Sequence, residues 1–321
     1  MRQSETAGAS RTTAAVLAAL VAGACWGVSF LAPRALPDVP PATLMFYRFL
    51  FFGVSSLLAL GIRRGRRPAI DREATRRALE LALLGYSAYY ALLSLGVQGI
   101  GVSFATAIIA LLPLTILLAA SSRSEWPGLA APIALIAVGG LLVPLELFGR
   151  AYGAFLANDV RLRILGLAAT LAALASWTAF AIRNARFLRE HPAWRPLDWA
   201  GVLGIASMVT GFAIFLAVER GSVVGALARG FGDARLLVWT GFMGVVGAWF
   251  TSALWNFASR VLRPAALGML LVFESVFGLL FGFLYDGRFP SAREGTAAAC
   301  LIVGAMLGIR RLRAVRPGPR P

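Results

Sequence analysis

The sequence predicts an all-α integral membrane protein with ten transmembrane helices. Ten apolar stretches run from Thr12 to Arg310, each close to the length of about twenty residues that crosses a bilayer as a helix. Arginines concentrate in the loops on one side of these stretches. The 321 residues are 59% hydrophobic and 14% charged, with a mean hydropathy of +0.75, so lipid must surround most of the folded surface.

The expected helices follow one another through short connections. They span residues 12–32, 42–62, 77–97, 100–120, 127–147, 163–184, 197–218, 235–256, 264–285 and 292–311. The tails 1–11 and 312–321 and the connecting loop 148–162 lie outside them. The chain therefore divides into a first group of five helices, 12–147, and a second group, 163–311.

Charged residues and prolines mark the helices of the first half. The first helix begins after Arg11, and a cluster of seven arginines at 63–77 separates the second helix from the third. Arg48 is the charged residue within the second helix. The fourth helix contains Pro113, which predicts a kink because proline lacks a backbone donor.

The second half is built in the same way. Its first helix, 163–184, is rich in alanine and is followed by arginines as far as Arg195. The eighth helix of the chain, 235–256, carries a polar face in an otherwise apolar segment. The ninth contains Glu274, the single carboxyl deep in a span, and the tenth runs into basic residues from Arg310 onward.

The distribution of arginine predicts the orientation of the chain. All 31 basic residues are arginine; 21 lie on the side of both tails, against 9 on the other side and Arg48 within a helix. Basic loops stay in the cytoplasm, so we expect both termini there, and the compact loops favour a bacterial inner membrane. The net charge of +16 is then a topology signal and does not indicate nucleic acid as a partner.

The two groups of five helices suggest an internal repeat. An odd number of helices per half forces the second half to lie inverted in the membrane. Residues 24–27 (Ala-Cys-Trp-Gly) in the first helix resemble residues 175–178 (Ala-Ser-Trp-Thr) in the sixth. We therefore predict two inverted five-helix repeats.

Three stretches carry a resemblance to a known family. They are residues 23–30 (Gly-Ala-Cys-Trp-Gly-Val-Ser-Phe), 46–49 (Phe-Tyr-Arg-Phe) and 273–278 (Phe-Glu-Ser-Val-Phe-Gly), the last followed by Leu-Tyr-Asp at 284–286. With the ten-helix layout, they make the chain similar to the drug/metabolite transporter (DMT) superfamily, whose members contain two EamA-type repeats. The chain departs from the family where relatives often have Glu-Pro in the ninth helix, because Ser275 follows Glu274 here.

The resemblance implies a secondary-active transporter that exports a small metabolite or drug-like compound. Two inverted halves would provide alternating access to a cavity near the midplane of the membrane. The sequence has no P-loop signature, so an ion or substrate gradient must drive uphill transport, and a proton is the simplest choice. No cofactor is expected, and the sequence does not determine whether the protein forms homo-oligomers.

Arg48 and Glu274 are the charged candidates for the transport site. An ionised side chain at the bilayer centre costs about 2.5–3.5 kcal/mol on insertion scales unless protein or water compensates it. Arg48 suits an anionic group of a substrate, and equally a structural arginine that pairs with helix carbonyls or an acid. Glu274 suits a carboxyl that loads and releases the coupling proton. The alternatives are a permanent ion pair between the two, or a protonated Glu274 bonded to a neighbouring helix.

Aromatic and polar side chains supply the other substrate-binding candidates. One face of the eighth helix carries Ser252, Trp255 and Asn256, where cavity lining and helix joining predict the same pattern. A similar face of the third helix carries Tyr86, Tyr89 and Tyr90. The repeat adds Trp26, Ser29 and Trp177, for which core packing is the alternative. The aromatic and arginine groups suit an amphipathic anion, whereas Glu274 with the tryptophans suits an organic cation.

An integral-membrane enzyme acting on a lipid or prenyl substrate is the alternative function. Such chemistry needs clustered acids, a nucleophile with a base, or metal ligands. The sequence offers one histidine, His191, two isolated cysteines, Cys25 and Cys300, and scattered acids. We therefore expect a transporter and not an enzyme, with no metal site, whose partners are a small-molecule substrate, the lipid bilayer and protons.

Overall fold

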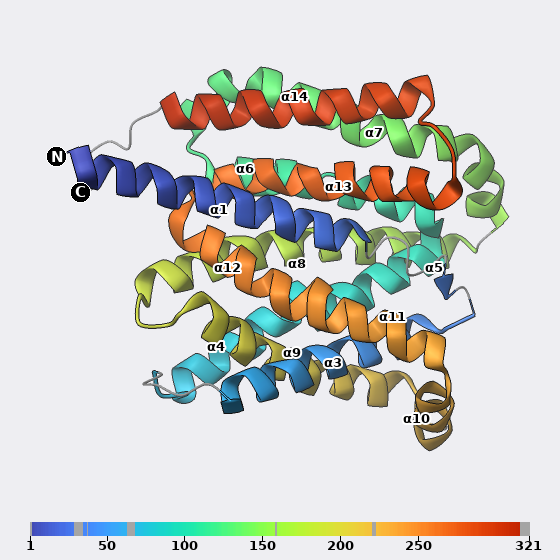
Figure 1. Ribbon diagram of the computed structural model, residues 1–321. Coiled ribbons are helices and arrows are strands. Elements are labelled where there is room, and N and C mark those ends of the chain that lie inside the picture. The colour runs from blue at the N-terminus through green and yellow to red at the C-terminus, as the bar shows by residue number, and fades with distance from the viewer. Residues whose placement is uncertain are drawn as a thin grey trace.

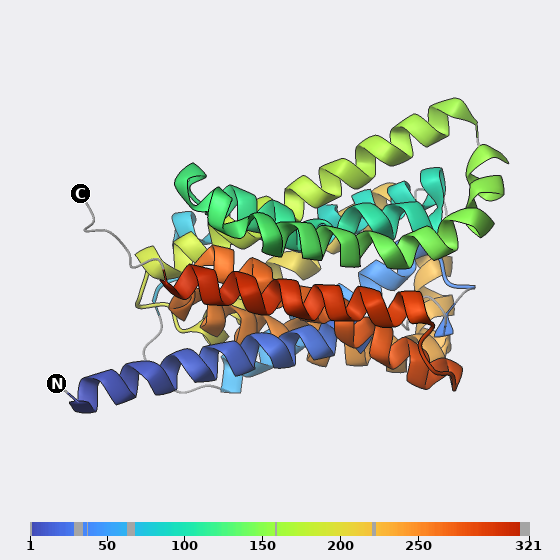
Figure 2. The same ribbon diagram turned by 90° about the horizontal axis from the view of Figure 1, so that it is seen from above.

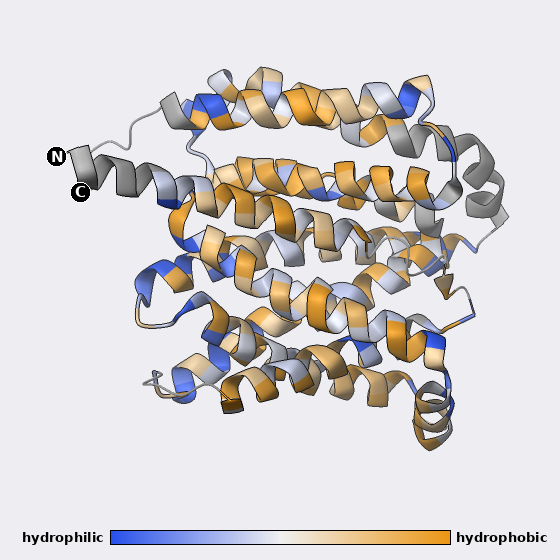
Figure 3. Cartoon of the chain, in the orientation of Figure 1, coloured by the Kyte–Doolittle hydropathy of each residue, from blue (hydrophilic) through white to orange (hydrophobic). Residues whose placement is uncertain are grey.

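The computed structural model describes residues 2–28, 35–36, 38–62, 68–157, 159–219 and 223–314, and the regular structure there is helical. The helices lie side by side in one bundle (Figure 1, Figure 2). Figure 3 shows apolar residues along the helices and hydrophilic residues gathered toward their ends, as in a bundle that crosses a bilayer. Within the described residues, nine helical stretches are long and apolar enough to cross a membrane. The predicted all-α membrane fold is confirmed.

The first half begins with two single helices, α1 (Arg2–Val28) and α3 (Pro41–Ile62). Its third span joins α4 (Arg72–Ala82), the π-helical segment η2 (Leu83–Ser87) and the first part of α5 (Ala88–Ile109). The half ends with α6 (Leu112–Ala120), the short 3-10 turn η3 (Arg123–Glu125) and α7 (Trp126–Ala157).

The second half begins with α8 (Val160–Glu190), α9 (Pro196–Val218) and the short helix α10 (Val223–Gly232). Its third span joins α11 (Ala234–Gly244), the π-helical segment η4 (Val245–Phe250) and α12 (Thr251–Val261). The last two spans are α13 (Pro264–Asp286) and α14 (Ala292–Ala314). In Figure 1, α1 begins and α14 ends at the same end of the bundle, as an even number of crossings requires.

The expected loop 148–162 is largely helical. Helix α7 continues through residues 148–157 and ends at Ala157. Asp159 then caps α8, because its side chain accepts a hydrogen bond from the backbone N–H of Arg161. The connection between the two halves is therefore short.

The predicted fourth helix, 100–120, is broken. Gly101 has φ 81° and ψ 160°, a conformation that is essentially restricted to glycine, and it separates the third span from the rest of α5. The chain leaves the helix again at residues 110–111, ahead of α6, whose first turn contains Pro113. Each piece is shorter than a bilayer crossing, and this stretch is not among the nine long apolar ones of the described residues. We interpret the two pieces together as the tenth predicted span.

The two halves use the same local features in the same order. The second span of each half begins with proline. The third span follows an aspartate cap and continues through eleven α-helical residues into a π-helical segment. The fifth span begins with a Ser-x-x-Glu capping box. In pairs, these residues are Pro41 and Pro196, Asp71 and Asp233, Ser122 and Ser291, and Glu125 and Glu294. Figure 1 places α4 at the end where α1 begins, whereas α11 begins at the other end, beside α10. This agreement supports the expected inverted repeat.

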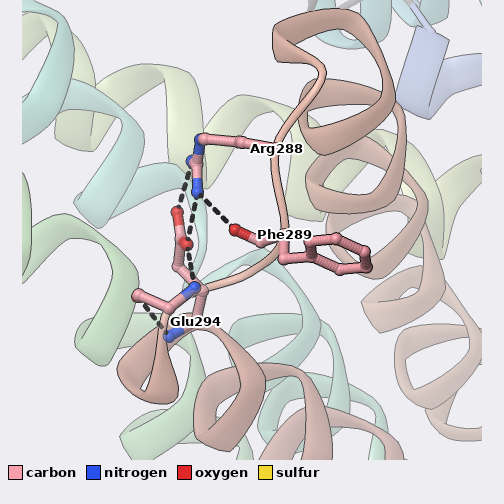
Figure 4. A network of polar contacts seen from close by, with 4 residues as sticks. Arg288, Phe289 and Glu294 are labelled. Atoms are coloured by element: carbon pink, nitrogen blue, oxygen red, sulfur yellow. Dashed lines mark hydrogen bonds and ion pairs between the residues drawn. The ribbon is translucent and has the colours of Figure 1, made fainter.

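Figure 4 shows the capping box that starts the last span. Glu294 accepts hydrogen bonds from the Ser291 backbone N–H at 2.8 Å and from both terminal nitrogens of Arg288 at 2.7 and 2.8 Å. Gly287, with φ 62°, ends α13 in the left-handed conformation that glycine tolerates. These contacts fix the tight turn between α13 and α14.

Candidate functional site

Three predicted tryptophans from three spans meet in the middle of the bundle. Trp26 of α1, Trp177 of α8 and Trp255 of α12 have ring centroids 5.3–6.1 Å apart, in edge-on or tilted contacts. Trp177 and Trp255 are only 9% and 2% exposed. The Trp26 indole N–H donates to the Gly247 carbonyl at 2.9 Å. That carbonyl lies in η4, where the wider turn alters the regular backbone pairing. We call these three residues the Trp cluster.

The two π-helical regions are joined beside the Trp cluster. The hydroxyls of Tyr86, in η2, and Ser252, in the first turn of α12 after η4, are 2.7 Å apart. The Tyr86 ring also contacts Phe52 and Phe180, with centroids 5.4 and 5.3 Å away. Tyr86 and Tyr89 pack against the same hydrophobic core as the Trp cluster. Tyr86, Ser252 and the three tryptophans thus form one continuous wall made by both halves.

Arg48 lies on α3 among aromatic rings. Its guanidinium carbon is 5.9 Å from the ring centre of Phe49 and 6.0 Å from that of Tyr90. Its Nε is buried and has no hydrogen-bond partner in the described part of the chain. The backbone around Arg48 is held tightly, since a Cβ at Gly244 of α11 would come within 2.5 Å of the Arg48 carbonyl. The aromatic faces compensate part of the charge, as cation-π contacts do.

Glu274 lies midway along α13. Its charge and that of Arg48 act on each other and on Tyr89. The ion pairs among the described side chains do not include one between Arg48 and Glu274, so no Arg48 nitrogen lies within 4.0 Å of a Glu274 carboxylate oxygen. The permanent ion pair that was one alternative is therefore not formed in this structure. We call Arg48, Tyr89, Tyr90 and Glu274 the central site.

Helix α1 runs close beside Glu274. A Cβ at Gly23 would lie 3.3 Å from the Glu274 backbone nitrogen, and one at Gly27 would lie 2.9 Å from the backbone nitrogen of Gly278. This pair of glycines four residues apart lets two helix backbones approach, as in other membrane bundles. Trp26 and Glu274 therefore lie on two helices whose backbones are in close contact.

Asn256 lies in a network of hydrogen bonds that bears on the two alternatives left open for its helical face, cavity lining and helix joining. Its side-chain oxygen accepts a hydrogen bond from Asn184 of α8 at 2.8 Å, and Asn184 accepts one from the Trp199 indole of α9 at 2.9 Å. The Asn256 amide also donates to the Pro196 carbonyl at 3.3 Å. All three side chains are buried. This network joins α8, α9 and α12, which favours the helix-joining alternative for Asn256.

Ser29, the remaining predicted site residue, lies outside the described residues. Sequence reasoning also missed Trp249, which packs with Tyr90 against the cluster of Phe49 and has a buried indole N–H without a partner. It missed the hydrogen bond of 2.7 Å between Thr115 of α6 and Thr178 of α8 as well. Thr178 directly follows Trp177, which the repeat had already selected, so the sequence could have indicated Thr178 as a candidate too.

A cavity of about 440 Å³ opens at the ends of α4 and α8, away from the central site. None of the predicted site residues lines it, and its wall holds four arginines and three glutamates. Glu80 there accepts hydrogen bonds from Arg77 and Arg183. Such nearly balanced charges at helix ends suit the level of the lipid headgroups more than a binding site within the membrane.

Comparisons with known proteins agree with this architecture. Residues 13–143 match the model of the EamA-like transporter family. The chain is 29% identical over 307 residues to the inner membrane protein YtfF of Escherichia coli (strain K12), covering 92% of this chain and 94% of YtfF. A solved crystal structure shares the fold with a TM-score of 0.69 at 17% identity, covering 94% of this chain and 99% of that one. These matches confirm the predicted resemblance: the chain is similar to EamA-type membrane proteins of the drug/metabolite transporter superfamily, and residues 13–143 match the EamA-like transporter model itself.

Proposed function

We propose that this chain is a secondary-active transporter of a bacterial inner membrane that exports a small metabolite or drug-like compound by alternating access. The observation that carries the proposal is the central site, where Arg48 of α3 and Glu274 of α13 interact electrostatically without forming an ion pair. Charged side chains inside a bilayer are costly, so an unpaired arginine and an acid facing each other mark a transport pathway better than a structural contact.

The packing of the halves supports the alternating-access mechanism. The helix pairs that pack across the two halves follow the repeat. The pair α5 and α8 has its equivalent in the pair α12 and α1. The pairs α3 with α9 and α7 with α14 each join two equivalent helices of the two halves. Inverted repeats of this kind reach two states in which each half adopts the conformation of the other. The Trp cluster, Tyr86 and Ser252 lie where the halves meet and are the proposed binding wall.

The orientation and the coupling ion are also part of the proposal. The arginine asymmetry places both termini in the cytoplasm, and the name of the relative YtfF supports the inner membrane. Glu274 carries the coupling proton, because it is the acid that faces Arg48 from a mid-membrane position.

Transient currents on a solid-supported membrane test the proposal. Proteoliposomes with wild type, Glu274→Gln, Arg48→Ala and the matched control Glu73→Gln would receive amino acids, organic anions and lipophilic cations. Glu73 is an exposed acid in the first turn of α4, so its variant controls for loss of a carboxyl as such. We expect a substrate-dependent signal in wild type and Glu73→Gln that Glu274→Gln and Arg48→Ala lose. Because a neutral transport cycle gives no current, radiolabelled uptake is measured in parallel; absence of both signals across the panel contradicts the proposal.

A further inference from the structure

Two buried hydrogen-bond donors of the described residues lack a partner in and beside the central site. The Arg48 Nε and the Trp249 indole N–H are buried and unbonded within the described residues. Tyr89 and Tyr90 of the central site are half-buried, and the Tyr90 ring lies 6.0 Å from the Arg48 guanidinium carbon. Buried polar groups in native proteins are nearly always paired, so each unpaired donor calls for an acceptor that is bound only part of the time. Two such donors, which both lie around the Phe49 and Tyr90 rings, form a site for an acceptor-rich group.

The Trp cluster does not provide a cage for a cation. A cage needs ring faces that are free to cover the ligand, as in the recognition of quaternary ammonium groups. Here Trp26, Trp177 and Trp255 cover one another, and two of the three are almost fully buried. Arg48 itself already lies beside the Phe49 and Tyr90 rings and would repel a second cation. The sequence left the charge of the substrate open, and these contacts favour an anion.

The charge balance of the central site then fixes the state of Glu274. With Arg48 positive and Glu274 negative, the empty site has no net charge. An anion bound to Arg48 would leave one uncompensated negative charge within the membrane, which is strongly unfavourable. A proton taken up by the Glu274 carboxylate restores neutrality without moving any helix.

We propose that the substrate is an organic anion whose negative group binds Arg48, Tyr89 and Tyr90, and that one proton binds to Glu274 together with it. The inference rests on the proposed function and names the substrate class of its site. Anion and proton then cross in the same direction as a neutral pair. Export follows whenever the outward gradient of the anion exceeds the inward gradient of protons.

Among the described residues, no other carboxyl group or histidine is placed to take this proton. The groups that act on Glu274 are Arg48 from α3 and Tyr89 from α5. Among the elements packed against α13, α1 and α14 contribute Cys25 and Cys300, and α6 has no titratable side chain. The charged residues of α1, α8, α12 and α14 lie toward the helix ends, far along the helix from the level of Glu274.

Calorimetric titration of the purified protein in nanodiscs tests the inference. The probes are benzoate, indole-3-acetate and phenyl phosphate, with benzamide and benzyltrimethylammonium as the neutral and cationic counterparts. Each titration is repeated in buffers of different ionisation enthalpy, which gives the number of protons bound per ligand. We expect an anion to bind with uptake of one proton, and its affinity to fall about tenfold per pH unit where the empty site is ionised, because binding and protonation are linked.

Variants separate the site from the fold. Glu274→Gln should still bind the anion, with no proton uptake and no pH dependence, whereas Glu73→Gln should match wild type. Arg48→Gln should lose anion binding, and Arg48→Lys, which keeps the charge, should retain a weakened form of it. Intrinsic tryptophan fluorescence and gel filtration confirm that each variant is folded.

Three results would overturn the inference: preference for benzyltrimethylammonium, anion binding without proton uptake, or no saturable binding of any of the three anions. Radiolabelled flux of the bound probe in proteoliposomes is measured separately. Flux of a cation with dependence on Glu274 would leave the proposed transport function standing while removing the anion and its proton. Absence of flux for every compound that binds would instead count against the transport function.

Discussion

Tyr86 and Ser252 connect the two π-helical regions of the molecule through their hydroxyls, which are 2.7 Å apart. Tyr86 lies in the third span of the first half and Ser252 in the third span of the second. Each π-helical turn widens its helix at the level of the Trp cluster, and such turns often occur at functional sites. The contact therefore joins equivalent elements of the two halves at the centre of the bundle.

Removal of the Tyr86 hydroxyl should weaken this connection without destroying the fold. Tyr86→Phe and Ser252→Ala should each lower the free energy of unfolding, and the double variant should cost less than their sum. The coupling energy should be about 0.6 kcal/mol, the average of interhelical hydrogen bonds in a membrane bundle. Unfolding in detergent with all four proteins of the cycle measures it. Full additivity would show that the hydroxyls do not interact.

The crossing of α1 and α13 predicts a steric effect at Gly27. A Cβ there would lie 2.9 Å from both the Gly278 nitrogen and the Phe277 Cβ, closer than such atoms approach. Gly27→Ala should therefore lower the free energy of unfolding by about 1–3 kcal/mol, the usual cost of overpacking. Gly282→Ala on α13 is the matched control, since no atom lies within 4 Å of its added Cβ. Equal melting temperatures for the two variants would contradict the close crossing.

Apolar periodicity and arginine placement predicted most of the fold, because bilayer thickness dictates helix length whatever the tertiary contacts are. The break in the fourth span was not predicted, since residues 100–120 are apolar on both sides of Gly101 and Pro113. The sequence does not show which glycine adopts a positive φ. The kink expected at Pro113 came closest to predicting this break. In the structure, Pro113 lies in the first turn of a separate helix, α6.

The site was predicted unevenly, and the reason is tertiary pairing. The repeat argument alone selected Trp26 and Trp177, and the structure brings both against Trp255. The helical face of Asn256 could not show that Asn184 lies opposite, because the partner of a polar face depends on how two helices pack. Trp249 was overlooked because a single tryptophan in an apolar helix has no distinguishing pattern.

Gly101 should be required for its backbone conformation and not for space. Its φ of 81° with ψ 160° lies in a region that side chains avoid, yet no atom lies within 4 Å of an added Cβ. Gly101→Ala should therefore lower the free energy of unfolding by about 1–3 kcal/mol through backbone strain alone. Gly128→Ala, at an equally open position in the first turn of α7, should be neutral or stabilising. An unchanged melting temperature for Gly101→Ala would argue against the sharp turn.

The network of Asn184, Asn256 and Trp199 should act on stability and not on substrate affinity. Asn184→Ala leaves the Trp199 indole N–H and the Asn256 oxygen buried and unbonded, which costs about 1–3 kcal/mol for each unsatisfied group. Asn256→Ala should cost a similar amount, because it frees the Asn184 amide. In proteoliposomes, folded protein of either variant should keep the apparent KM of wild type for the transported substrate, whereas Tyr90→Phe at the central site should raise it. A large rise in KM for Asn256→Ala at unchanged stability would instead favour cavity lining, the other alternative that its helical face left open.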